Sequence, residues 1–132
     1  MNLHRPEIDD VTRPFWQGLA EGRLLGSRCR ACREIAGYHR GFCPACWSDD
    51  VTDVELSGRA TLYSYSVVHL NPMPPFADLV PYVAALVDLV EGPRLAPRLV
   101  DVDPDDVAIG MALTARFEVV DEGEGVVLFG PA

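Results

Sequence analysis

The four cysteines of this chain fall into two close pairs, Cys29-Arg-Ala-Cys32 and Cys43-Pro-Ala-Cys46. Two cysteines separated by two residues can turn the backbone around one metal ion, so that both sulfurs become ligands. Two such turns complete a tetrahedral shell of four thiolates, the preferred coordination of structural zinc. The sequence therefore predicts one zinc ion bound by Cys29, Cys32, Cys43 and Cys46. Such a closed site holds structure and performs no chemistry, because no ligand position stays open.

Two other uses of the cysteines fit the sequence less well. A redox dithiol needs only one such pair, and no βαβ pattern surrounds either of them. Disulfides belong to oxidising compartments, and nothing at the N-terminus resembles a secretory signal, so we expect a reducing, cytoplasmic location. The ten residues between Cys32 and Cys43 suffice for a short hairpin, although this spacing is shorter than is usual for such pairs.

Length and composition indicate a small folded protein. The chain has 132 residues, which suits one domain or one domain with a small appendage. Hydrophobic residues make up 48% of it, enough for a buried core. No apolar run reaches the roughly 18 residues that a membrane span requires, so no membrane partner is expected.

The charge is acidic overall and unevenly distributed. The formal net charge is −9, yet residues 1–40 hold seven arginines and five acids, for a local net charge of +2. Residues 41–132 hold four arginines and fifteen acids, for −11. Nonspecific binding to nucleic acid relies on cationic surface, so the balance disfavours nucleic acid as a partner.

Four arginines, Arg28, Arg30, Arg33 and Arg40, lie in or beside the cysteine segment. A zinc tetrathiolate carries a formal charge of about −2, which part of this positive charge offsets. The plainest interpretation of the remainder is solvated surface charge. The alternative is contact with an anionic ligand, because guanidinium forks suit phosphates and CoA carries phosphate groups.

The segment before the cysteines predicts a short helix over about residues 14–23. Thr12 is expected to cap it, and Phe15, Leu19 and Leu24 form a stripe at helical spacing. A helix this short must pack on another part of the protein to be stable. Around the cysteines, strands are expected over residues 24–28, 35–39 and 51–56.

From Ser57-Gly58 onward the pattern is all-β, and the predicted domains are residues 1–56 and 57–132. Three prolines stiffen the loop at 71–75, and Asp103 is expected to cap a single turn. Five strands of similar length suggest a small barrel of the oligonucleotide/oligosaccharide-binding (OB) type. They are predicted over residues 60–70, 82–90, 95–102, 112–120 and 126–129, and Pro97 indicates an edge or a bulge within the third.

The order of several short motifs resembles one known family across about residues 14–130. These motifs are Pro14-Phe15-Trp16, the two cysteine pairs, Ser57-Gly58, Leu86-Val87-Asp88-Leu89 and Glu91-Gly92-Pro93. They are similar to those of acyl-CoA-associated proteins that join a rubredoxin-like zinc ribbon to an OB-fold, long catalogued as a domain of unknown function. The chain departs from that family in having Arg33 and Trp47 where glycines commonly follow each cysteine pair, and His39-Arg40 where Pro-Arg is usual.

The resemblance implies a mostly β fold, with an N-terminal helix and rubredoxin-like zinc ribbon followed by a five-stranded OB-fold barrel. It also implies a non-catalytic accessory subunit of a thiolase-superfamily enzyme, such as a thiolase, an acyltransferase or a thiolase-like aldolase of steroid side-chain degradation. Such a subunit joins the thiolase-like protein and helps to hold or channel the acyl-CoA thioester. We expect Arg28, Arg30, Arg33 and Arg40 to be the residues that contact CoA.

Two other functions remain open from the residues alone. A single-stranded nucleic-acid-binding module would use Tyr63, Tyr65 and Tyr82 as stacking platforms, although core and cross-strand packing is the plainer interpretation. A small free-standing enzyme would use His69 as a general base, but the sequence offers no obvious relay for it.

Two further interpretations concern aromatic and histidine side chains. Trp47 and Phe76 are either core residues or anchors of a protein interface. His39 is interpreted as a surface or packing residue, because four thiolates already fill the shell of a tetrahedral zinc ion.

Overall fold

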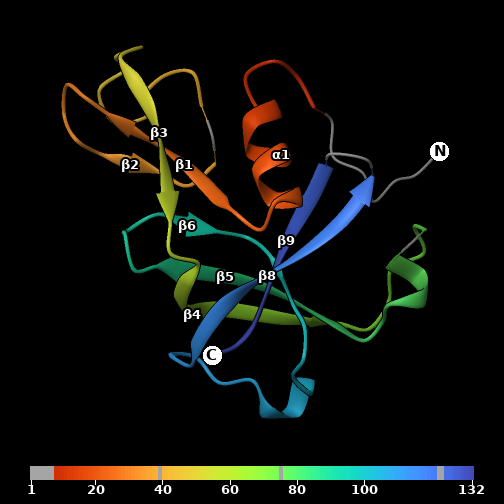
Figure 1. The fold of residues 1–132 in the computed structure, drawn as a ribbon. Helices are drawn as coiled ribbons and strands as arrows, with labels where there is room; N and C mark the ends of the chain where they lie inside the picture. The colour runs from red at the N-terminus through yellow and green to blue at the C-terminus, as the bar shows by residue number, and fades with distance from the viewer. Residues whose placement is uncertain (1–7, 39, 75, 122–123) are drawn as a thin grey trace.

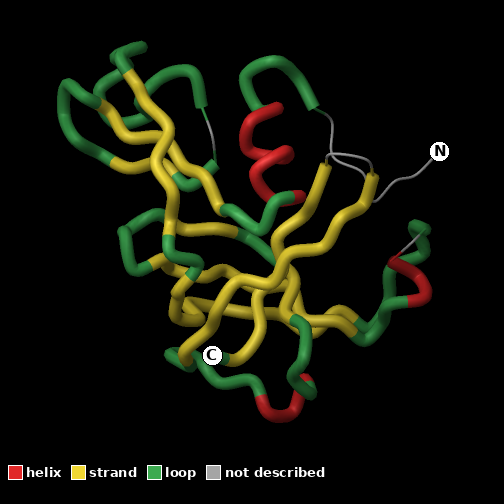
Figure 2. Tube along the Cα trace, viewed as in Figure 1, coloured by secondary structure: helices red, strands yellow, loops and turns green. Residues whose placement is uncertain are grey.

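A computed structural model describes residues 8–38, 40–74, 76–121 and 124–132, which form one α-helix and two β-sheets (Figures 1 and 2). The smaller sheet stands at the upper left of Figure 1 and contains the cysteine segment. The larger sheet curls into a barrel below it, and the helix lies between the two. Within the described residues, the helices lack the length and the apolar character that a membrane crossing would need.

The smaller sheet has the strand order β2-β1-β3 and is antiparallel throughout. Strand β1 pairs with β3 along its whole length, from Leu24 opposite Leu56 to Cys29 opposite Val51. Pairing with β2 is confined to two residues, so the strand predicted over 35–39 is shorter than expected. The strands are β1(Leu24–Cys29), β2(Ile35–Ala36) and β3(Val51–Leu56).

The larger sheet closes into the predicted five-stranded circuit. Its order is β4-β8-β9-β7-β5, and a further pairing of β4 with β5 completes the ring. The short β6 also pairs with β5, on the edge that β7 occupies further along. The elements are β4(Arg59–Val68), β5(Tyr82–Leu89), β6(Arg94–Leu95), β7(Arg98–Leu99), β8(Ala112–Asp121) and β9(Glu124–Pro131).

The strand predicted over 95–102 is interrupted, and the interruption lies at Pro97, where an edge or a bulge was expected. The strand is split into β6 and β7 around Pro97, which has no N–H to donate but accepts a 2.9 Å hydrogen bond from the Ala85 amide through its carbonyl. Because both pieces follow the same edge of β5, the barrel keeps five strand positions. The acidic turn predicted at 121–125 is tighter than expected, since Asp121 already pairs with Glu124, and its tip at 122–123 lies outside the described residues.

Two short 3₁₀ turns, η1(Phe76–Asp78) and η2(Pro104–Asp106), lie in the loops of the barrel. The second confirms the predicted cap, because the Asp103 carboxylate accepts a 2.9 Å hydrogen bond from the Asp105 amide.

The helix α1(Arg13–Ala20) ends three residues earlier than predicted. Gly22 adopts a left-handed φ of 77°, and its amide bonds back to the Leu19 carbonyl, so the chain turns away from the helix there. Leu24, counted in the predicted helical stripe, belongs instead to β1.

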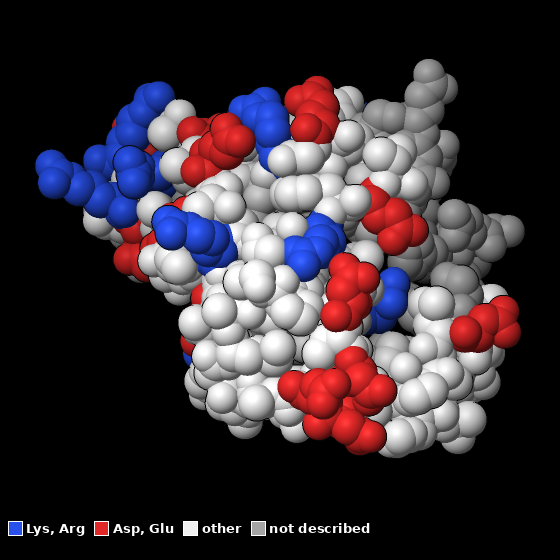
Figure 3. Space-filling view, turned by 60° about the horizontal axis from the view of Figure 1, so that its bottom comes forward, with Lys and Arg blue, Asp and Glu red and all other residues white. Residues whose placement is uncertain are grey.

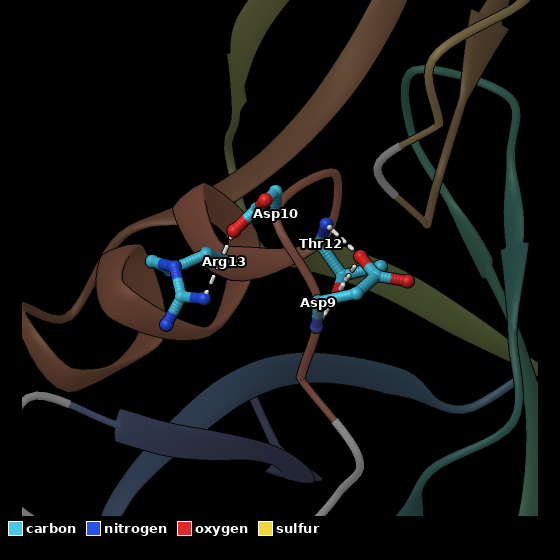
Figure 4. Close-up of polar contacts among 4 residues, drawn as sticks. All are labelled: Asp9, Asp10, Thr12 and Arg13. Atoms are coloured by element: carbon cyan, nitrogen blue, oxygen red, sulfur yellow. Dashed lines mark hydrogen bonds and ion pairs between the residues drawn. The ribbon is translucent and has the colours of Figure 1, made fainter.

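The start of the helix also differs from the prediction (Figure 4). Thr12 occupies the N-cap position, but its side chain makes no capping bond. The Asp9 carboxylate instead accepts hydrogen bonds from the Thr12 amide at 2.8 Å and hydroxyl at 3.1 Å. The Thr12 amide is the main reason that the pKa of Asp9 lies below its usual value. Arg13 forms an exposed ion pair with Asp10 at 3.1 Å.

The helix packs on the barrel, beside β8 and β9. Phe15 and Leu19 share one buried cluster with barrel residues such as Phe129, and Leu24 joins it from the base of the smaller sheet. Gly125 permits this contact, because a Cβ on it would lie 2.6 Å from the backbone nitrogen of Ala20. The buried core is therefore continuous across the boundary predicted between residues 56 and 57. The division of the chain into two domains at that point stays a prediction.

Candidate functional site: the metal centre and the ribbon surface

The four cysteine sulfurs converge at the far end of the smaller sheet, and all lie within 4.8 Å of one another. The Sγ atoms of Cys29 and Cys46 are 3.6 Å apart, and those of Cys32 and Cys43 are 3.5 Å apart. In a tetrahedral site with Zn–S bonds of about 2.3 Å, sulfurs lie about 3.8 Å from one another. All four cysteines are free of disulfides. The donor set and its spacing therefore fit a zinc ion.

The two cysteine pairs form equivalent turns. In the first, the Cys32 amide donates to the Cys29 sulfur at 3.4 Å, and the amide of the following Arg33 donates to the Cys29 carbonyl. In the second, the Ala45 amide donates to the Cys43 sulfur at 3.4 Å, and the Trp47 amide donates to the Cys43 carbonyl. A backbone amide thus donates a hydrogen bond to the first sulfur of each pair.

The thiols differ in how readily they lose a proton. The Cys32 amide is the main cause that lowers the pKa of the Cys29 thiol to about 6. At Cys32 the Glu34 amide lowers the pKa, but the neighbouring thiols, Cys43 first, and burial raise it to about 12 overall. One thiolate is therefore available near neutral pH, whereas a metal ion has to displace the proton of Cys32.

The residues that follow the two pairs have an unusual backbone conformation. Arg33 and Trp47 both have a φ of 68°, in the left-handed region that favours glycine. Non-glycine residues held there cost roughly 1–3 kcal/mol each. At both positions the resemblance noted in the sequence led us to expect glycine. Both cysteine turns therefore carry this backbone strain, and each has a large side chain at the strained position.

Trp47 is an exposed aromatic residue. Its side chain is 77% exposed and stacks on Phe42, with ring centroids 5.5 Å apart and an interplanar angle of 11°. The interpretation of Trp47 as a core residue was wrong, whereas its role as an interface anchor stays a prediction. Phe76 is half-buried, with its ring 6.1 Å from that of Tyr82.

Three of the four predicted arginines meet around one open hollow of about 500 Å³, which Arg28, Arg30 and Arg33 line together with Cys29. Arg40 is not among the lining residues, and its backbone is bound by its amide and carbonyl to the hydroxyl of the buried Ser27. We call the smaller sheet with its cysteine turns, residues 24–56, the ribbon. Figure 3 shows basic side chains gathered over it at the upper left and acidic ones along the lower part of the barrel. The structure thus places a concave basic surface beside the metal centre.

The tyrosines of β4 point outward, so their interpretation as core residues was wrong. Tyr63 is 49% exposed, and a register shift between Leu62 and Ser64 accompanies it. The Arg94 guanidinium lies 3.5 Å from the centre of the Tyr63 ring. That cation covers one face of the ring, so a base could stack only on the other face. Tyr65 is also exposed, and its hydroxyl donates to the Val107 carbonyl at 3.4 Å.

The other tyrosine and the histidines add little to the site. The hydroxyl of Tyr82 is half-buried and accepts a 2.9 Å hydrogen bond from the Asn71 amide group. His69 is exposed at the end of β4, and the described residues place no carboxylate in a hydrogen bond with it. His39 lies outside the described residues.

Two arrangements were missed by reasoning from the sequence. The stacking of Phe42 on Trp47 joins two residues on either side of the second cysteine pair, and the placement of Arg94 over Tyr63 joins two barrel strands. Tryptophan at position 47, where glycine was expected, was the one sequence signal for the stacking of Phe42 on Trp47. For the second no signal existed, since the contact depends on the bulge in β4.

Two family models match the chain in succession. "ChsH2, rubredoxin-like zinc ribbon domain" matches residues 16–52, and "ChsH2, C-terminal OB-fold domain" matches residues 53–118. Together with the clustered cysteines, the first match makes the cysteine segment a zinc ribbon. The second agrees with the closed barrel.

Similar proteins include both free-standing and longer chains. A DUF35 domain-containing scaffold protein of Methanocaldococcus jannaschii is 38% identical over 92% of this chain and 89% of its own length. A probable enoyl-CoA hydratase alpha subunit of Thermomonospora curvata is 37% identical over 97% of this chain, which spans only 40% of that relative. A chain of the Ltp2–ChsH2(DUF35) aldolase has the same fold, with a TM-score of 0.83 and 36% identity over 96% of this chain and 98% of that one.

Proposed function

This chain belongs to the ChsH2-type DUF35 family, which joins a rubredoxin-like zinc ribbon to an OB-fold, and on that premise we propose that it is a non-catalytic accessory subunit of an enzyme acting on acyl-CoA thioesters. The observation that carries the proposal is its likeness, over nearly the full length of both chains, to a chain of the Ltp2–ChsH2(DUF35) aldolase. The partner we propose is a thiolase-superfamily protein, as the resemblance implies. Within the complex, this chain helps to hold or channel the thioester.

The zinc site serves structure in this proposal. Cys29, Cys32, Cys43 and Cys46 are the proposed ligands, and four protein thiolates leave no position for water or substrate. Among the described residues, hydroxyl groups meet carboxylates only in exposed turns, Thr12 with Asp9 and Ser57 with Glu91, and His69 lies exposed at the surface. The reacting groups are therefore expected in the partner subunit.

The exposed pair of Trp47 and Phe42 is the proposed anchor for that partner. Aromatic residues dominate the energetics of protein interfaces, and this pair is already stacked before any partner binds, so little side-chain freedom is lost on docking. The strained backbone at Trp47 supports the assignment, because glycine there would relieve the strain but would lose the anchor.

Co-expression with the thiolase-superfamily protein encoded nearest to this chain tests the proposal. We expect the two to co-elute in size-exclusion chromatography and the large subunit to lose activity or solubility when expressed alone. Trp47→Ala should weaken assembly by about 2 kcal/mol, roughly 30-fold in Kd, and Phe76→Ala tests the second predicted anchor. Ile109→Ala, at a 68% exposed apolar residue of the barrel segment, is the matched control and should leave assembly unchanged. A fully active large subunit that never co-elutes with this chain contradicts the proposal.

Two competing functions are outcomes of simple measurements. A hydratase partner is favoured by the T. curvata relative, and co-purification of a hydratase in place of a thiolase would establish it. Binding of single-stranded nucleic acid predicts retention on a single-stranded DNA column. At a net charge of −9 we expect the protein to pass through.

A further inference from the structure

The hollow beside the metal centre has the features of an anion site. Three arginines from two segments line it, Arg28 at the end of β1 and Arg30 and Arg33 in the first cysteine turn. None of the described residues that line it is acidic. All three residues are exposed, so their guanidinium groups can be reached by a ligand from solvent.

The three arginines are not equally available. Arg30 lies 3.3 Å from a carboxylate oxygen of Asp50, which neutralises part of its charge. Among the described residues, the ion pairs include neither Arg28 nor Arg33. A bound zinc tetrathiolate adds a formal charge of about −2 behind the hollow, which weakens the field at long range. A ligand is therefore held by direct contacts with the guanidinium forks and not by the net charge of the ribbon.

We propose that Arg28, Arg30 and Arg33 bind the phosphate groups of CoA in this hollow, with Arg33 and Arg28 supplying most of the affinity. The inference rests on the proposed function for the identity of the ligand, since CoA carries both a diphosphate and a 3′-phosphate. Planar guanidinium groups bind such phosphates through paired N–H donors. Arg40, which the sequence grouped with these three, stands outside the hollow and is excluded from the site.

The backbone at Arg33 supports a role in binding. Its φ of 68° suits glycine, so any side chain at this position raises the energy of the folded ribbon. The residue is exposed and lines the hollow, so no burial compensates for that cost. Arg33→Gly is consequently informative: a residue with only a structural role would show unchanged or improved stability and nothing else, whereas a binding residue would also show weaker CoA affinity.

Titration calorimetry of CoA and dephospho-CoA against the co-purified complex, or against the chain alone if nothing co-purifies, tests the inference. For Arg33→Gly and Arg28→Ala we expect Kd for CoA to rise about three- to tenfold, as for loss of one solvent-screened ionic contact. We expect dephospho-CoA to bind more weakly than CoA, and the difference to shrink in at least one variant. Binding should also weaken with added salt.

Arg40→Ala is the matched control, because it removes one arginine of the same ribbon without touching the hollow. Equal losses in Arg40→Ala and Arg33→Gly would overturn the inference in favour of a diffuse field. Unchanged CoA affinity in both Arg28→Ala and Arg33→Gly would also overturn it. If these variants weaken subunit assembly but leave CoA affinity intact, the arginines contact carboxylates of the partner, and the proposed function stands while this inference fails. If no complex forms, the proposed function is refuted. Titration of CoA against the chain alone then still shows whether the hollow binds CoA.

Discussion

The barrel and the tip of the ribbon bury different kinds of side chain. In the barrel, Phe129 and Val87 are fully enclosed at 0% exposure, and the helix adds Phe15 and Leu19 to the same cluster. At the tip of the ribbon, the buried side chains among the described residues are those of Cys29 and Cys43, and the buried polar residue Ser27 lies on the same strand as Cys29. Apolar burial stabilises the barrel, whereas we expect the tip of the ribbon to depend on metal ligation for its stability.

This contrast indicates which region of the molecule has side chains available for binding a partner or ligand. A metal-held loop needs few of its side chains for packing, so the side chains around the sulfurs are free for other uses. The ribbon displays Trp47 on Phe42 and the three arginines of the hollow, and it tolerates left-handed backbone at Arg33 and Trp47. The barrel carries the greater part of the acidic charge and serves as the rigid support.

The largest expected effect is the loss of ribbon stability when a metal ligand is removed, with the barrel left folded. Cys43→Ser should abolish zinc binding and cost roughly several kcal/mol of ribbon stability, since metal binding in such modules is folding free energy. Hydrogen exchange should accelerate over residues 24–52 and stay slow in β4, β5 and β8. Metal analysis should give one zinc per native chain and well under one in the variant. Fast exchange throughout the variant would show that the barrel also depends on zinc.

The next effect breaks the barrel instead. Phe129→Ala removes a fully buried ring and should destabilise the protein by about 3–5 kcal/mol in chemical denaturation. The zinc content of the folded fraction should stay at one per chain, because the sulfurs lie in the other sheet. Phe42→Ala, which removes a ring of the same size from the exposed pair, is the control and should cost far less. Loss of zinc in folded Phe129→Ala protein would contradict the separation.

A smaller effect tests how the helix is joined to the barrel. Gly125→Ala places a Cβ 2.6 Å from the backbone of Ala20 and should cost about 1–3 kcal/mol, because backbone on both sides must move. Gly41→Ala in the ribbon meets only a methyl group of Val11 at 3.7 Å and is the matched control. Equal melting temperatures for the two variants would show that the helix does not pack against β9 as closely as described.

The smallest effect concerns the turn before the helix. The folded-state pKa of Asp9 is lowered, so the Asp9 carboxylate stabilises the fold above its unfolded pKa, and this contribution is lost as pH falls through the lowered value. Asp9→Ala should therefore lower the melting temperature slightly at neutral pH and have no effect in strong acid. Asp10→Ala, with a 99% exposed side chain, serves as the control. A difference that persists in acid would rule out the charge as its cause.

Much of the fold follows from local patterns, and the failures have physical causes. The strand over 51–56 and the turn capped by Asp103 are confirmed because alternation and a capping residue act locally. Pro97 itself signalled the irregularity in its strand, whereas the exposure of Tyr63 accompanies a register shift in the pairing with β5, which alternation alone does not report. The cysteine spacing predicted the metal cluster, whereas the hollow required knowledge of which arginines share one side of the ribbon.

The contact between α1 and β9 constrains the order in which the chain acquires structure during synthesis. The helix lies at residues 13–20 and its docking strand at residues 124–131, so almost the entire chain must leave the ribosome before the two can meet. The cysteines and β3 are all translated by residue 56, and the ribbon can capture its metal while the barrel is still incomplete. Until β9 arrives, Phe15 and Leu19 lack the β9 side of their buried cluster, which includes Phe129. A nascent chain stalled before β9 is thus expected to carry zinc and to expose an apolar helix, which makes it a substrate for chaperones.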